Sequence, residues 1–158
     1  MKGYKDSIII NHSIDKVFKS FIDLNRKEMP KFNKKNPIET EYKRIIKQLG
    51  NKKIEMITKI TKYEKEKYYE VTNIVEKDVY VSSFVFDIID ENSCKLTLIE
   101  EQHIGMLSRI FMRVFKGISS KIKLKKKLKK ISTMIDEDII SNTKLDTYTS
   151  FSTIFVTS

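Results

Sequence analysis

The sequence is short of several residue types on which particular functions depend. It has one cysteine, Cys94, two histidines, two prolines, four glycines and no tryptophan among 158 residues. A single cysteine excludes an internal disulfide and is typical of a reducing compartment. The four glycines form no phosphate-binding loop and no Gly-x-Gly-x-x-Gly motif, which argues against a nucleotide cofactor. We therefore expect the protein to work without a cofactor.

Long apolar runs are also missing. No run approaches the roughly 18 to 20 residues that cross a bilayer, and residues 1–11 lack the apolar segment of a secretory signal. Hydrophobic residues make up 40% of the chain and charged residues 33%, which is typical of a globular protein. We expect a single cytoplasmic domain, long enough to bury about two thirds of its unfolded surface.

Residues that could bind a metal or act in catalysis are few. His12 lies where a strand is expected to pass into a helix, and a capping or surface role is expected there. Glu101 and His103 would share one face of a strand, but two ligands are too few for a metal site, and Cys94 has no motif spacing to them. We therefore predict no metal site and no catalytic residue.

The positive charge is local. Residues 105–136 hold ten of the 31 Lys and Arg residues and one acid, Asp136, so ten minus one gives +9 of the net charge of +10. The same segment has apolar residues at helical spacing, which predicts one long helix: Leu107, Phe111, Val114, Ile118, Leu124, Leu128, Ile131 and Ile135. The stripe slips by one residue after Ile118, so we expect a bend near Gly117.

The N-terminal third predicts a strand followed by a helix. The strand covers Tyr4 to Ile10, and the helix covers about Ile14 to Leu24. One face of this helix carries Val17, Phe18, Phe21 and Ile22. Residues 25–37, with Pro30 and Pro37, predict a loop, with one helical turn as an alternative for part of it, in which Met29 and Phe32 are partly buried anchors.

After Pro37 the apolar period changes to two, which predicts five antiparallel strands: about 39–49, 52–62, 68–75, 79–89 and 93–104. Gly50-Asn51 predicts a two-residue hairpin that pairs Leu49 with Lys52 and Ile45 with Met56, so that Ile45 and Leu49 face the core. Between the last two strands, a three-residue or bulged turn is needed to place Phe84, Phe86 and Ile88 on the face of Leu96 and Leu98.

This order of elements forms an α+β arrangement and resembles the START-like (SRPBCC) superfamily with its helix-grip fold, in particular small bacterial members of unknown function with a lysine-rich last helix. The resemblance covers about residues 4–136. It lies in the element order and in four patterns: Ile10-Asn11-His12-Ser13, Gly50-Asn51, Tyr68-Tyr69-Glu70-Val71, and Leu96-x-Leu98-x-Glu100-Glu101.

The resemblance implies a curved antiparallel sheet of about six strands wrapped around a long C-terminal helix, with an apolar ligand held between them. We expect residues 1–136 to form this helix-grip domain. Residues 137–158 would be a C-terminal tail, not a domain. Within it, residues 143–158 are expected to be frayed or loosely docked, and addition to a sheet edge or docking on the domain are the alternatives.

A pocket between sheet and helix would use inward-facing residues, and the predicted set is Ile54, Met56, Thr58, Tyr69, Ser82, Phe84, Phe86, Leu98, Glu100, Phe111 and Phe115. Core packing is the commoner role for the aromatic members. For Glu100, a solvent-exposed position at the end of its strand is the commoner environment. If Glu100 were instead buried without a cation, its carboxyl would be partly neutral and could act as a general acid.

Four lysines of the last helix, Lys125, Lys126, Lys129 and Lys130, have three interpretations. A solvated face is the default, an anionic membrane surface or acidic partner comes second, and nucleic acid comes last because no aromatic residue is interleaved after Phe115. The predicted helix of about 48 Å exceeds strands of roughly 35 Å, and we expect its lysine-rich half to project beyond the sheet.

The function predicted from the sequence is binding or carriage of a small apolar or amphipathic molecule without catalysis. The alternatives are an enzyme of the same fold, similar to polyketide cyclases or aromatases, and a basic interaction module for anionic surfaces. Ligand identity and oligomeric state stay open.

Overall fold

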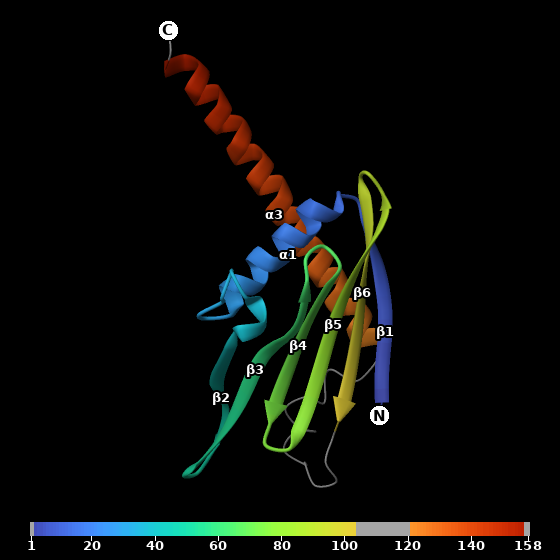
Figure 1. The fold of residues 1–158 in the computed structure, drawn as a ribbon, viewed down its shortest axis with the longest axis vertical. Helices are drawn as coiled ribbons and strands as arrows, with labels where there is room; N and C mark the ends of the chain where they lie inside the picture. Colours follow the sequence, from blue (N-terminus) through green and yellow to red (C-terminus); the bar gives the residue numbers. More distant parts are fainter. Residues whose placement is uncertain (1, 104–120, 157–158) are drawn as a thin grey trace.

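The computed structural model describes residues 2–103 and 121–156, and it has the α+β order predicted from the sequence (Figure 1). In chain order the elements are β1 (Lys2–Ile10), α1 (Ile14–Glu28), the 3-10 turn η1 (Pro37–Glu39), β2 (Glu41–Leu49), β3 (Lys52–Glu64), β4 (Tyr68–Val75), β5 (Asp78–Asp90), β6 (Ser93–His103) and α3 (Lys121–Val156).

The six strands form one antiparallel sheet in the order β1-β6-β5-β4-β3-β2. The sheet is curved, and α1 packs against β5 and β6 while α3 packs against β1 and α1. Figure 1 shows both helices on the same side of the sheet. A curved antiparallel sheet gripping a long C-terminal helix is the helix-grip fold, so the predicted fold class is confirmed.

The turn between β5 and β6 confirms the bulge expected there. Asp90 pairs with Ser93 across a two-residue turn, and the register shifts between Ile88 and Asp90. The extra residue, Ile89, restores the shared parity, because a bulge places two residues of one strand opposite one of the other. Phe84 then pairs with Leu98 and Phe86 with Leu96 on the inner face.

The β2–β3 hairpin confirms one predicted pair and contradicts the other. Gly50 takes a left-handed φ of 58° in the turn, and Leu49 pairs with Lys52. Ile45, however, pairs with Glu55, because a bulge at Ile46 shifts the register, and Arg44 pairs with Met56 instead. A shift of one residue exchanges the two faces, so Ile45 is 52% exposed. Leu49, near the hairpin tip, is 43% exposed, and the predicted core positions for both residues are wrong.

Helix α1 runs four residues beyond its predicted end at Leu24, so that end is wrong and the alternative of one helical turn holds for residues 25–28. Its last residue is Glu28, and Met29 follows with an extended backbone at φ −111° and ψ 102°. A residue before proline is pushed out of the helical region, so Pro30 ends the helix at this point and no earlier. Met29 is buried and Phe32 partly buried, as predicted.

Helix α3 continues for 20 residues past its predicted end at Asp136, so that predicted end is wrong. The sequence after Gly117 contains no glycine or proline that would stop a helix. Ile139 is buried, and Asp138 contacts α1. The domain boundary at residue 136 stays a prediction, and the bend at Gly117 and the stripe at 107–118 lie outside the described residues.

The lysine-rich half of this helix does not project from the sheet, and that prediction is wrong. Leu124, Leu128 and Ile135 are almost completely buried, and Ile131 packs against the same cluster. β1 and α1 cover this apolar stripe. The part of α3 that extends beyond the sheet is its distal end, red in Figure 1.

Candidate ligand pocket

An open pocket of about 430 Å³ lies between the inner face of the sheet, the second half of α1 and the start of the described part of α3. We call it the sheet–helix pocket. Its lining residues are Phe21, Leu24, Asn25, Glu28, Met29, Tyr42, Arg44, Thr58, Val71, Asn73, Ser82, Phe84, Lys127, Lys130, Ile131 and Met134.

The sheet side of the pocket has a floor of short polar side chains. Thr58 pairs with Asn73 across β3 and β4, and its hydroxyl donates a hydrogen bond of 2.7 Å to the Asn73 amide oxygen. Ser82 lies one row further along, opposite Val71. Because these side chains are short, they leave space above the sheet that larger residues would fill.

Arg44 reaches the pocket because of the β2 bulge. It pairs with Met56, whose side chain is buried on the inner face, while Lys43 pairs with Ile57 on the outer face. Without the bulge at Ile46, Ile45 would pair with Met56 and lie on the inner face in place of Arg44. The sequence carries no signal that we can identify for this bulge, and Arg44 was accordingly absent from the predicted pocket.

The α1 wall is mainly apolar and ends in one acid. Phe21 packs against Phe84, with 4.8 Å between ring centroids. Met29 lies where the Tyr69 hydroxyl donates to its sulfur at 3.7 Å. Burial raises the pKa of Tyr69 well above its usual range, so this hydroxyl is a neutral donor. Glu28, in the last turn, is exposed and lines the pocket.

The α3 wall brings a lysine onto a buried acid. Glu100 is only 3% exposed, and the Lys127 ammonium donates a hydrogen bond to its carboxylate. Glu100 was expected to act as a general acid only if it were buried without a cation. Because Lys127 pairs with it, that condition is not met. Lys130, one helical turn on, lines the pocket and is exposed.

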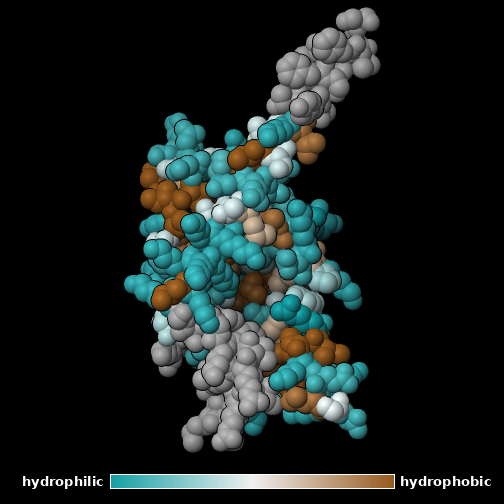
Figure 2. Space-filling view, turned by 180° about the vertical axis from the view of Figure 1, so that it is seen from behind, coloured by the Kyte–Doolittle hydropathy of each residue, from teal (hydrophilic) through white to brown (hydrophobic). Residues whose placement is uncertain are grey.

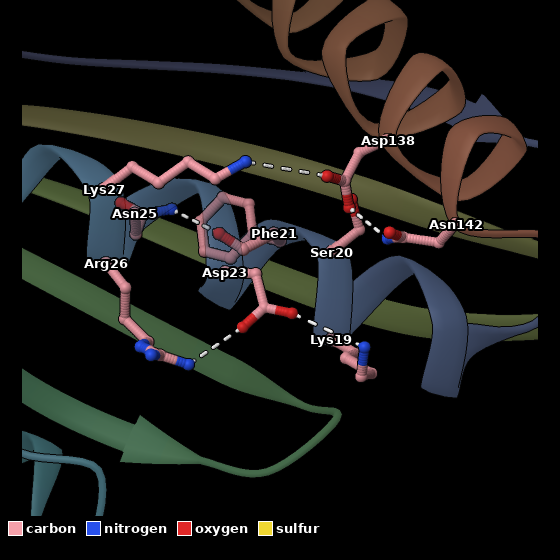
Figure 3. Close-up of polar contacts among 9 residues, drawn as sticks. All are labelled: Lys19, Ser20, Phe21, Asp23, Asn25, Arg26, Lys27, Asp138 and Asn142. Carbon is pink, nitrogen blue, oxygen red and sulfur yellow. Dashed lines mark hydrogen bonds and ion pairs between the residues drawn. The ribbon is translucent and has the colours of Figure 1, made fainter. Parts of the chain in front are cut away.

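Polar contacts between the two helices hold these walls together (Figure 3). The buried Ser20 hydroxyl donates to the Asp138 carboxylate at 2.8 Å, and Lys27 lies 3.8 Å from its other oxygen. Asn142 donates to the same carboxylate at 3.2 Å. Since Asp138 lies one turn of α3 beyond Met134, these contacts fix the spacing between α1 and α3 beside the pocket.

The structure brings together part of the predicted pocket. Thr58, Ser82 and Phe84 line it. Tyr69, Phe86 and Leu98 belong to the main core cluster, and Ile54 and Met56 to a smaller one with Val75 and Tyr80. Glu100 lies under Lys127, and Phe111 and Phe115 are outside the described residues. Besides Arg44, the prediction missed Val71 and Asn73, although the alternation of inward and outward residues in β4 would have indicated both. It also missed the α1 wall, because the position of that helix depends on tertiary packing.

The lysine cluster is divided between two environments. Lys125, Lys126 and Lys129 are exposed on α3, and hydrophilic residues cover most of the face seen in Figure 2. Lys130 instead lines the pocket. Within residues 2–103 and 121–156, no group of three or more His, Cys, Asp or Glu side chains could hold a metal ion. None of the described helices combines the length and apolarity of a membrane span.

Comparison with known proteins identifies a family but no activity. A family model described as "Domain of unknown function (DUF3284)" matches residues 5–117. The chain belongs to this family. A comparison with curated proteins gave no match.

Solved structures with the same fold cover most of the chain. A conserved protein from Geobacillus kaustophilus has a TM-score of 0.57 at 17% identity, over 87% of this chain and 96% of that one. A protein from Mesorhizobium loti has a TM-score of 0.58 at 12% identity, over 86% and 98%. Norcoclaurine synthase from Thalictrum flavum has a TM-score of 0.51 at 18% identity, over 86% and 87%. At identities this low, the likeness shows that the protein has the same fold as these three structures.

Proposed function

We propose that the protein binds or carries a small apolar or amphipathic molecule in the sheet–helix pocket without transforming it, and that it is a START-like (SRPBCC) protein. The observation that carries this proposal is the pocket itself. Its volume of about 430 Å³ falls within the range of roughly 300 to 1,000 Å³ that small-molecule sites occupy. The fold shared with norcoclaurine synthase supports a ligand-binding scaffold.

The lining favours an amphipathic ligand. One wall is apolar and comes from both helices and the sheet: Phe21, Leu24, Met29, Val71, Phe84, Ile131 and Met134. The floor is polar, with Thr58, Asn73 and Ser82. A mostly apolar wall with a few convergent polar groups is the usual composition of a small-molecule site.

A pocket-blocking variant tests this proposal. Met134 is a partly exposed helix residue at the pocket, so Met134→Trp adds bulk there with little disturbance of the core. Thr133→Trp, at the adjacent exposed position outside the pocket, is the matched control. We expect the uncharged dye Nile red to bind the wild type at one per chain, Met134→Trp to weaken binding at least tenfold, and Thr133→Trp to stay within twofold of wild type.

The same titration can contradict the proposal. Dye fluorescence that rises only as the protein unfolds, or equal weakening by both tryptophan variants, would show that the pocket is not the binding site. Native mass spectrometry of protein purified from cells adds a direct observation, since a retained small molecule would give its mass.

A second candidate function, adhesion to anionic surfaces, is favoured by the exposure of Lys125, Lys126 and Lys129. Each lysine near such a surface contributes about 1 kcal/mol at most. Because Lys130 belongs to the pocket, the triple variant Lys125→Gln, Lys126→Gln and Lys129→Gln tests the surface alone. We expect it to lose low-salt sedimentation with phosphatidylglycerol vesicles while retaining Nile red. Unchanged sedimentation would leave these lysines as a solvated face.

A further inference from the structure

The sheet–helix pocket combines an apolar wall with two cations, Arg44 and Lys130, that form no ion pair within residues 2–103 and 121–156. We propose that its ligand is an amphipathic anion, an apolar chain or ring system ending in a carboxylate or phosphate, whose charged end is bound by Arg44 and Lys130. This inference rests on the proposed function and specifies the class of molecule that the pocket takes.

Arg44 is the first observation. The bulge at Ile46 places it on the inner face opposite Met56, whereas the nearest acid of its own strand, Glu41, pairs with Lys59 at 2.8 Å. In the part of the chain that the structure describes, no hydrogen bond or ion pair engages the Arg44 guanidinium. A guanidinium offers paired N–H donors that match a carboxylate or phosphate.

The distribution of lysines on α3 is the second observation. Lys127 is neutralised by the buried Glu100, but Lys130, three residues later on the same wall, has no ion pair within residues 2–103 and 121–156. Among the lining residues, Arg44 and Lys130 therefore face one acid, Glu28. Two cations minus one acid leave the pocket with one positive charge.

The apolar wall lies beside these cations and decides between a free anion and an amphipathic one. Inorganic phosphate would leave the partly exposed Ile131 and Met134 facing water, whereas an apolar chain would cover them and gain roughly 25 cal/mol for each Å² buried. Because Arg44 and Lys130 are exposed to solvent, their Coulomb attraction for an anion is modest in magnitude. It still favours an anionic ligand over a cationic one, which these residues would repel. Charge should therefore set selectivity, while chain length should set affinity.

A series of four probes with one chain length tests the charge: dodecanoate, dodecyl phosphate, 1-dodecanol and dodecyltrimethylammonium. Displacement of Nile red from the wild-type protein would be measured below the critical micelle concentration of each ionic probe and below the solubility limit of 1-dodecanol. We expect the two anions to bind at least tenfold more tightly than the alcohol, and the ammonium to bind most weakly. Inorganic phosphate at the same concentrations should displace no dye.

Two double variants with the same change in net charge locate the effect. Arg44→Gln with Lys130→Gln removes the pocket cations, while Lys43→Gln with Lys129→Gln removes their exposed neighbours outside it. We expect the first to weaken dodecanoate at least tenfold and leave 1-dodecanol within twofold. The second should leave both probes within twofold of wild type.

Several results would overturn the inference. Equal affinity for dodecanoate and 1-dodecanol would leave the proposed function standing and remove the anion. Preference for dodecyltrimethylammonium would assign recognition to Glu28. Equal losses of dodecanoate affinity in both double variants would show that the net positive charge of the protein attracts the anion, and not a site formed by Arg44 and Lys130. Failure of the wild type to bind Nile red or any of the four probes would contradict the proposed function itself, and the inference with it. The wild-type series decides the charge preference even if a variant folds poorly.

Discussion

The two ends of the sheet's inner face differ in how they are filled. Toward the β5–β6 turn, Phe86 lies between Phe18 and Phe21 at centroid distances of 5.0 and 5.2 Å, and Leu96 and Leu98 beneath them have no measurable exposure. We call this end the packed half. Toward the β2–β3 hairpin, the corresponding positions carry Thr58, Asn73 and Ser82, and the space above them is the sheet–helix pocket.

One face of the sheet is therefore closely packed at one end and holds an open pocket at the other, and the size of the side chains differs between the two ends. Both halves belong to the same strands, β3 to β6, and are covered by the same two helices. Their boundary runs through the row Val71, Ser82 and Glu100, where aromatic residues give way to short polar ones and to a buried charge pair. Four predictions test this division.

The largest effect should come from truncating the packed half. Phe86→Ala should lower the free energy of unfolding by roughly 3 to 5 kcal/mol, because removal of a buried Phe leaves a cavity that the surroundings only partly fill. Urea denaturation would measure it. Ile88→Ala, two residues along the same strand but 69% exposed, should change stability by less than about 0.5 kcal/mol. Equal losses in both would remove the distinction between core and surface at this end.

Thiol reactivity compares the halves directly. Burial raises the pKa of Cys94, in the packed half, to about 11 from an ordinary value of 9.0. A raised pKa favours the neutral thiol, so at pH 8 the reactive thiolate is about 100-fold rarer than for an unperturbed thiol. A cysteine in the pocket, from Ser82→Cys combined with Cys94→Ser, should react with a disulfide reagent at least 100-fold faster than Cys94 in the wild type.

Similar rates in these two proteins would show that the pocket is closed to solvent or that the packed half opens readily. A rate for Cys94 that follows the unfolding rate as urea is added would support the packed half as a unit without access for the reagent.

The charge pair at the boundary should give a smaller effect. Lys127→Met leaves the Glu100 carboxylate buried without its cation, and we expect a loss of about 1 to 3 kcal/mol, reduced from the cost of a fully buried pair because Lys127 is 43% exposed. Adding Glu100→Gln should restore most of it in urea denaturation. A double variant no more stable than Lys127→Met would show that the loss comes from packing and not from charge.

The smallest change in stability should follow from filling the pocket. Ser82→Leu adds apolar volume where space exists, so we expect a change within about 1 kcal/mol together with loss of Nile red binding. Cys94→Leu adds a similar bulk in the packed half, where overpacking costs about 1 to 3 kcal/mol. If Ser82→Leu were the more damaging of the two, the pocket would be filled in solution.

How much the sequence could predict depends on how local the determinants are. Alternation of apolar residues located the five strands after Pro37 and the inner face of β5 and β6. Parity required a three-residue or bulged turn between those two strands, and the structure has a bulge at Ile89. Gly50-Asn51 fixed the hairpin tip because few residues tolerate a positive φ. These features follow from a few neighbouring residues, and so the chain determined them by itself.

Other features were decided only by tertiary structure. The bulge at Ile46 turned Arg44 inward and Ile45 outward, because one extra residue re-aims the side chains beyond it, and no local sequence pattern marks its position. The Lys127–Glu100 pair joins residues 27 positions apart, and Glu100 could be buried only once α3 brought a cation to it. The sequence by itself determined the strands and the inner faces of β5 and β6. The docking of α1 and α3 decided which inward residues became core and which became pocket, because that choice depends on long-range packing.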